Sequence, residues 1–96
     1  GPSAENLVVH EYAFEVGSDA VTIRGDLGWS GLLDLDLYLV DPEGNEVASG
    51  ATLANPEYLE YDVAIPGTYT WRITGYVSVF ADYTLNETQV HAVSGN

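Results

Sequence analysis

Apolar and polar residues alternate along several short stretches of this chain. The clearest alternation lies at 35–39, where Leu35, Leu37 and Leu39 are separated by Asp36 and Tyr38. A repeat of two residues is typical of a β-strand that buries one face. The other stretches with this pattern are 7–16, 21–29, 59–63, 69–74 and 82–90. No segment shows the 3.6-residue period of an amphipathic helix, so the pattern predicts strands throughout.

Turn-forming residues separate these stretches. After the leucine strand, Asp41 is placed to accept a backbone hydrogen bond from two residues on, Pro42 fixes φ at the first corner, and Gly44 tolerates a positive φ. The segment 34–49 therefore predicts a strand, a tight turn and a returning strand. Pro66-Gly67 suits the corners of a type II turn. Turn signals spaced about 8 to 12 residues apart predict an all-β protein, an antiparallel β-sandwich or jelly roll of about seven to eight strands.

The length of 96 residues fits one domain. We expect residues 1–3 to be the remnant of a cleaved expression tag and residues 4–96 to form a single domain. The chain contains no cysteine, which removes disulfides and cysteine-ligated metals from consideration. It has no apolar run of the roughly 20 residues that a membrane helix needs. We expect a monomer.

The net charge of the chain limits which classes of partner it can bind. The chain carries 15 acidic residues against Arg24 and Arg72, with no lysine and a net charge of −13. Such a surface repels phosphate backbones and anionic lipids, so nucleic-acid binding is excluded and membrane binding disfavoured. It attracts cations, Ca²⁺ above all.

The sequence contains little evidence of a catalytic site. Serines are present, with His10 and His91 as candidate bases, but no Gly-x-Ser-x-Gly motif occurs. Both histidines fall near the chain ends, where we expect them on the surface of outer strands. A glycosidase would need two acids facing a cleft, for which a domain of this size leaves little room. We therefore expect no enzymatic activity.

Calcium binding is the better-supported chemistry. Asp34 and Asp36 lie two residues apart and project to one face of the predicted strand. Asp82 enters the last strand and is expected to approach them, which makes these three the predicted metal ligands. Glu60 and Asp62 are alternatives for the third position. The competing interpretation is a solvated polar face behind a leucine stripe, which many half-buried strands show.

The aromatic residues allow a second function. Trp71 alternates with Tyr69 and Ile73 and is expected in the core. Tyr38 and Tyr58 fall on the acid-bearing faces of their strands, where they could form a platform for polysaccharide or fibrous protein. Ordinary exposed tyrosines on a plain sheet would give the same pattern.

These motifs occur in a recognisable order. Trp29 is followed by 34–45, then by Glu60-Tyr61, 66–70 and 82–85. This order resembles the pre-peptidase C-terminal (PPC) domain family, in particular the β-jelly-roll domain that follows subtilisin-like serine proteases of bacteria and archaea. The resemblance implies a secreted, non-catalytic accessory domain, often Ca²⁺-binding, that stabilises its parent enzyme or helps to hold polymeric substrate. The parent catalytic domain is then the expected partner. The family pattern covers Asp34 and Asp36, whereas Asp82 is added on geometric grounds.

Overall fold

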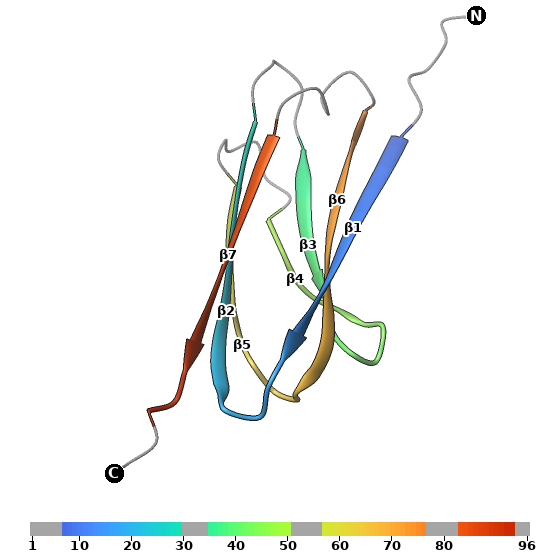
Figure 1. Ribbon diagram of the computed structural model, residues 1–96. Coiled ribbons are helices and arrows are strands. Elements are labelled where there is room, and N and C mark those ends of the chain that lie inside the picture. The colour runs from blue at the N-terminus through green and yellow to red at the C-terminus, as the bar shows by residue number, and fades with distance from the viewer. Residues whose placement is uncertain (1–6, 30–34, 51–56, 77–82, 94–96) are drawn as a thin grey trace, which may run out of the picture.

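A computed structural model describes residues 7–29, 35–50, 57–76 and 83–93. Within these ranges the chain forms strands and no helix, which confirms the predicted all-β class (Figure 1). The strands are β1 (Leu7–Val16), β2 (Ala20–Trp29), β3 (Asp36–Val40), β4 (Glu46–Ser49), β5 (Glu57–Asp62), β6 (Gly67–Tyr76) and β7 (Tyr83–His91). No helix able to cross a membrane occurs in these ranges.

The strands form two antiparallel sheets. One has the order β1-β6-β3-β4 and the other the order β5-β2-β7. The chain changes sheet at every connection except the β3–β4 hairpin, so the two sheets are built together from segments far apart in sequence. This arrangement is the expected sandwich, and its core forms between the two inner faces.

The core consists of the apolar side chains that alternate along the strands and point inward from each sheet. Leu35, Leu37 and Leu39 are fully buried, together with Trp71 and Ile73 of the adjacent β6. The second sheet contributes Ile23, Leu27 and Leu59. Because burial of each such side chain stabilises the fold by about 1.5 to 3 kcal/mol, the leucine stripe is a main source of stability.

The hairpin turn has the predicted chemistry. Asp41 Oδ1 accepts hydrogen bonds from the backbone N–H groups of Glu43 and Asn45, both at 2.9 Å. Gly44 has a φ of 84°, a value that other residues rarely adopt. Gly67, after Pro66, also has a positive φ, at 135°. The hairpin turn is therefore confirmed, whereas at Pro66-Gly67 only the positive φ of the glycine is seen, because Gly67 already begins β6.

The two lateral sides of the sandwich differ. β4 and β5 lie together at one side, where they contact each other. At the other side β1 and β7 face each other, each at the outer edge of its own sheet. Figure 1 is seen from this side, with β1 and β7 running in the same direction down the front of the molecule.

Candidate functional site

A groove runs between β1 and β7. It is open to solvent and has a volume of about 550 Å³. Its lining consists of Tyr12, Ala13, Phe14, Trp71, Tyr83, Thr84, Leu85 and Glu87, and we call this site the β1–β7 groove. It exists because, among the described strands, β1 pairs by backbone with β6 alone and β7 with β2 alone, which leaves the space between the two sheet edges open.

The floor of the groove is aromatic. Trp71 is only 1% exposed, and its indole stacks on the ring of Phe14 with centroids 5.5 Å apart and an interplanar angle of 17°. The indole reaches across the sandwich to β2 at Gly25, where a Cβ atom would lie 2.5 Å from the ring carbon Cη2. The glycine therefore allows Trp71 to take this position. The indole Nε1 is buried and has no hydrogen-bond partner among the described residues.

One wall of the groove carries a cluster of hydroxyl and imidazole groups. The hydroxyl of Tyr83 is hydrogen-bonded to His10 Nδ1 at 2.9 Å and to the hydroxyl of Tyr12. Burial, with the Tyr12 hydrogen bond as the next cause, raises the pKa of Tyr83 to about 12. The protonated Tyr83 hydroxyl is thus engaged with His10 and Tyr12 and holds this wall of the groove together.

The two histidines differ from each other in environment. His91 is exposed, as expected. His10 is half-buried and faces Tyr83 across the gap between the sheets, so the expectation of a surface histidine is wrong for this residue. The alternation along β1 places His10 on the same side as Tyr12 and Phe14, which is the core-facing side.

Glu87 gives the groove a negative group. Its carboxylate Oε2 accepts a hydrogen bond from Gln89 Nε2 at 2.9 Å, and the same amide also donates to the backbone carbonyl of Glu15 at 3.2 Å. Gln89 thus bridges β7 to β1 below the groove and holds the Glu87 carboxylate at its rim. The groove combines a flat apolar floor with an acid and hydroxyl groups along its walls.

Of the three predicted calcium ligands, only Asp36 lies in the described residues. It begins β3, is half-buried, and pairs with Thr74 of β6. Its neighbours in sequence, Leu35 and Leu37, face the core, so Asp36 faces outward from its sheet. Asp34 and Asp82 lie outside the described residues. Within the described ranges, no three His, Cys, Asp or Glu side chains are grouped closely enough to hold a metal ion.

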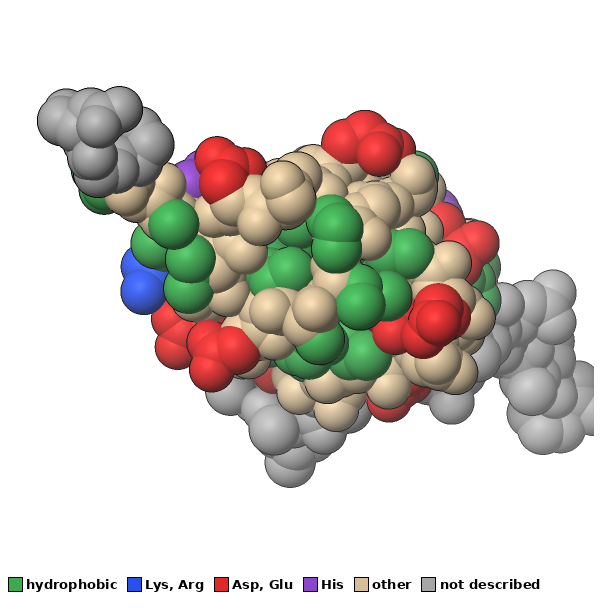
Figure 2. Space-filling view, turned by 90° about the horizontal axis from the view of Figure 1, so that it is seen from below, with side chains coloured by type: hydrophobic (Ala, Val, Ile, Leu, Met, Phe, Trp, Pro, Cys, Tyr) green, Lys and Arg blue, Asp and Glu red, His purple; other side chains and the backbone are tan. Residues whose placement is uncertain are grey.

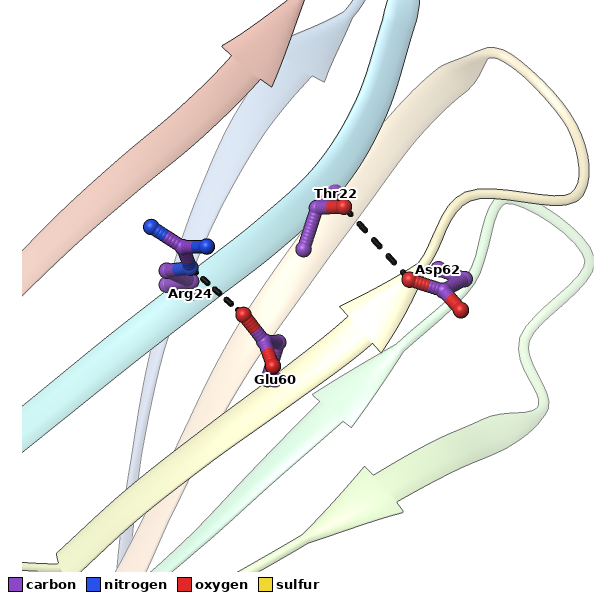
Figure 3. Close-up of polar contacts among 4 residues, drawn as sticks. All are labelled: Thr22, Arg24, Glu60 and Asp62. Carbon is purple, nitrogen blue, oxygen red and sulfur yellow. Dashed lines mark hydrogen bonds and ion pairs between the residues drawn. The ribbon is translucent and has the colours of Figure 1, made fainter.

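The alternative ligands Glu60 and Asp62 do not join Asp36. Glu60 Oε2 forms an ion pair with Arg24 Nε at 2.5 Å, and Asp62 accepts a hydrogen bond from Thr22 at 3.4 Å (Figure 3). These contacts lie on the outer face of the β5-β2-β7 sheet, whereas Asp36 faces outward from the other sheet. The hydrogen bond and charge of Glu60 raise the pKa of Arg24.

Tyr38 and Tyr58 are likewise separated. Tyr38 pairs with Arg72 and faces outward from the first sheet, whereas Tyr58 pairs with Asp26 and faces outward from the second. The two side chains therefore point to opposite sides of the molecule and form no common platform. Trp71 is in the core, as expected, but it also forms the floor of a groove that the sequence did not predict.

The sequence patterns did not lead us to predict that one acidic side chain, Glu57, is buried. Glu57 is 2% exposed and pairs with Leu27 on the core-facing side of β5. A Cβ atom on Gly50 would lie 3.1 Å from its Oε2, so this glycine leaves room for the carboxylate. The sequence could have indicated this burial, because Glu57 lies two residues before the buried Leu59 and therefore on the same face of the strand.

One comparison with known proteins identifies the family. The sequence model that describes the bacterial pre-peptidase C-terminal domain family matches residues 9–75, well over half of the 96 residues. The match spans β1 to β6 almost completely and includes the leucine strand and both predicted turns. The chain belongs to the bacterial pre-peptidase C-terminal domain family, whose members are non-catalytic accessory domains of proteases.

Proposed function

We propose that this domain serves a secreted, subtilisin-like protease by holding polymeric substrate in the β1–β7 groove, next to the parent catalytic domain. The groove is the observation that carries the proposal. The exposed ring of Tyr12 and the half-buried rings of Phe14 and Tyr83 offer stacking area, and the walls carry hydroxyl and carboxylate groups, the combination typical of ligand sites. Family membership supports the accessory role and an extracellular location.

The groove is preferred to the outer faces for a physical reason. On those faces Tyr38 and Tyr58 stand apart, so a polymer would meet single aromatic side chains. In the groove, Tyr12, Phe14 and Tyr83 lie together, and binding hot spots form where aromatic groups are grouped and water is excluded.

Retention on insoluble polymers tests this function. The 96-residue chain is incubated with an insoluble fibrous protein and with an insoluble polysaccharide, and the bound fraction is measured. We expect Tyr12→Ala to weaken binding about fivefold or more, since truncating a hot-spot aromatic costs over about 1 kcal/mol. Tyr58→Ala is the matched control, because Tyr58 is similarly exposed, at 51% against 43% for Tyr12. The proposal fails if neither polymer retains the chain, or if both variants have the same effect.

A second candidate function is stabilisation of the parent enzyme by Ca²⁺. It is supported by the net charge of −13 and by Asp36, a half-buried carboxylate at the start of β3. The described residues do not form a calcium site on their own, so Asp36 would supply one ligand. Asp34 and Asp82, outside the described residues, would supply others.

Thermal unfolding tests the calcium hypothesis. An ion that binds only the folded state adds about 2.7 kcal/mol when its concentration is about 100 times Kd. We expect the Tm to rise with Ca²⁺ and fall with EGTA, and we expect Asp36→Asn to reduce the rise. Asp26→Asn is the control, because Asp26 is also half-buried but faces outward from the other sheet. An equal Tm in Ca²⁺ and EGTA contradicts calcium binding.

A further inference from the structure

We infer that the β1–β7 groove binds an extended peptide segment of positive charge, with an arginine or lysine side chain against the aromatic lining and the Glu87 carboxylate beside it. This inference rests on the proposed substrate-holding function and names the class of substrate. It follows from three properties of the groove: its edges, its charge and its aromatic lining.

The edges of the groove favour an extended chain. β1 and β7 are edge strands, and an exposed strand edge can pair by backbone hydrogen bonds with an added extended segment. Ala13 and Thr84 line the groove although alternation points their side chains away from the core, so the strand backbone forms part of its wall. The carbonyl of Glu15 accepts a hydrogen bond from the Gln89 side chain, so the backbone acceptor of this edge of β1 points toward β7.

The charge of the molecule favours a basic occupant. The chain has two basic side chains apart from histidine, and both are engaged on outer faces: Arg24 with Glu60, and Arg72 with Glu11 at 3.1 Å. Neither is therefore available in the groove, where Glu87 supplies a carboxylate. In Figure 2, acidic side chains are spread around the lower end of the molecule, and basic atoms show on one side only. A positively charged ligand is attracted by this field and an acidic one is repelled.

The lining provides a specific place for the cation. The faces of tyrosine, phenylalanine and tryptophan rings attract guanidinium and ammonium groups, and the attraction grows where water is excluded. Tyr12, Phe14 and Tyr83 supply such rings next to Glu87.

Two other occupants fit less well. A second copy of the chain would bring two molecules of net charge −13 together, which electrostatic repulsion opposes. A neutral oligosaccharide could stack on the aromatic rings and donate hydroxyl hydrogen bonds to Glu87, but it has no positive charge to pair with that carboxylate and no backbone to pair with the strand edges. The basic peptide is the one occupant that uses all three properties.

Fluorescence anisotropy with labelled peptides tests the inference. We use the 96-residue chain and three short extended peptides in which threonine alternates with arginine, glutamine or glutamate. We expect the arginine peptide to bind, the glutamine peptide to bind about tenfold more weakly, and the glutamate peptide not to bind. Added salt should weaken the arginine complex, because exposed charges are screened beyond about 8 Å at physiological ionic strength.

Isosteric variants locate the site. Glu87→Gln keeps an acceptor for Gln89 and should weaken the arginine complex about threefold, the size of one partly exposed charge pair. Glu43→Gln is the control, since Glu43 lies in the exposed hairpin turn and should leave the affinity unchanged. Tyr12→Ala should weaken the complex by more than Glu87→Gln, because it removes ring area.

The outcomes separate this inference from the proposed function. If all three peptides bind equally and Tyr12→Ala weakens each of them, the groove holds substrate but the preference for positive charge is wrong. If the arginine peptide binds and neither groove variant matters, it binds elsewhere on the acidic surface, and the inference is overturned. If only an oligosaccharide binds, or if the chain dimerises through the groove, the inference is also overturned. If no ligand binds, both proposals fail.

Discussion

The position of Trp71 depends on the absence of a side chain at Gly25, and this dependence gives a sharp prediction. In a β-strand, replacing glycine by alanine normally stabilises a protein slightly, because the unfolded chain becomes less flexible. At Gly25 the sign should reverse. A Cβ atom there would lie 2.5, 2.8 and 3.0 Å from three carbons of the Trp71 benzene ring.

The size of the effect follows from these distances. Carbon atoms in contact normally lie about 3.5 to 4.0 Å apart, so the indole would have to move by about 1 Å. Phe14 is stacked on the ring at 5.5 Å and limits this movement. Overpacking of this kind costs about 1 to 3 kcal/mol. We therefore expect Gly25→Ala to lower the free energy of unfolding by about 2 kcal/mol, equivalent to a fall in Tm of about 10 °C for a domain of this size.

Equilibrium urea unfolding, followed by circular dichroism, measures this change in a double-mutant cycle. Trp71→Phe removes the three ring carbons that the new Cβ would meet. We expect Gly25→Ala to be neutral or slightly stabilising in the Trp71→Phe protein, which gives a coupling of about 2 kcal/mol or more between the two sites. The reasoning is refuted if Gly25→Ala is as stable as the parent chain, or if its cost is the same with phenylalanine at position 71.

Three further predictions concern other contacts. The pKa of Tyr83 is raised to about 12 from 10, so folding favours the protonated hydroxyl. Stability should be full below about pH 10 and fall by about 1 kcal/mol towards pH 12, a loss reduced by solvent screening of this partly exposed group. Alkaline titration of unfolding should show that Tyr83→Phe loses this part of the pH dependence. Asp41→Ala should lower the free energy of unfolding in urea by about 1 to 2 kcal/mol, because two backbone N–H groups of the hairpin turn lose their acceptor. Arg24→Ala should leave the Tm nearly unchanged, since its ion pair with Glu60 is exposed to solvent. A clear fall in Tm would show that this pair matters more than its exposure suggests.

Local patterns in the sequence were sufficient for the strands and turns. Alternation identified the buried face of the leucine strand, because side chains in a strand point to opposite sides at every step. The chemistry of Asp41 and Gly44 identified the hairpin turn, since both act within a few residues of their own position. These features depend on neighbours in the chain, so the sequence displays them directly.

The groove depends on pairings that alternation does not encode. His10 and Tyr83 are 73 residues apart, and their contact arises only because β1 and β7 lie at the same side of the sandwich. Alternation likewise showed that Tyr38 and Tyr58 face away from the core, but not that they belong to different sheets. The two predictions that failed, a common platform of Tyr38 and Tyr58 and the approach of Glu60 to Asp36, could have been avoided only by knowing which sheet each strand belongs to.

Substrate holding in the β1–β7 groove is tested most directly by nuclear magnetic resonance. A ¹⁵N-labelled 96-residue chain is titrated with the arginine–threonine peptide while the backbone amide shifts are followed. We predict saturable shift changes concentrated in β1 and β7, together with a change at the indole N–H of Trp71. Shift changes confined to the outer faces of the sheets, or none at concentrations where the peptide is in large excess, would contradict this function.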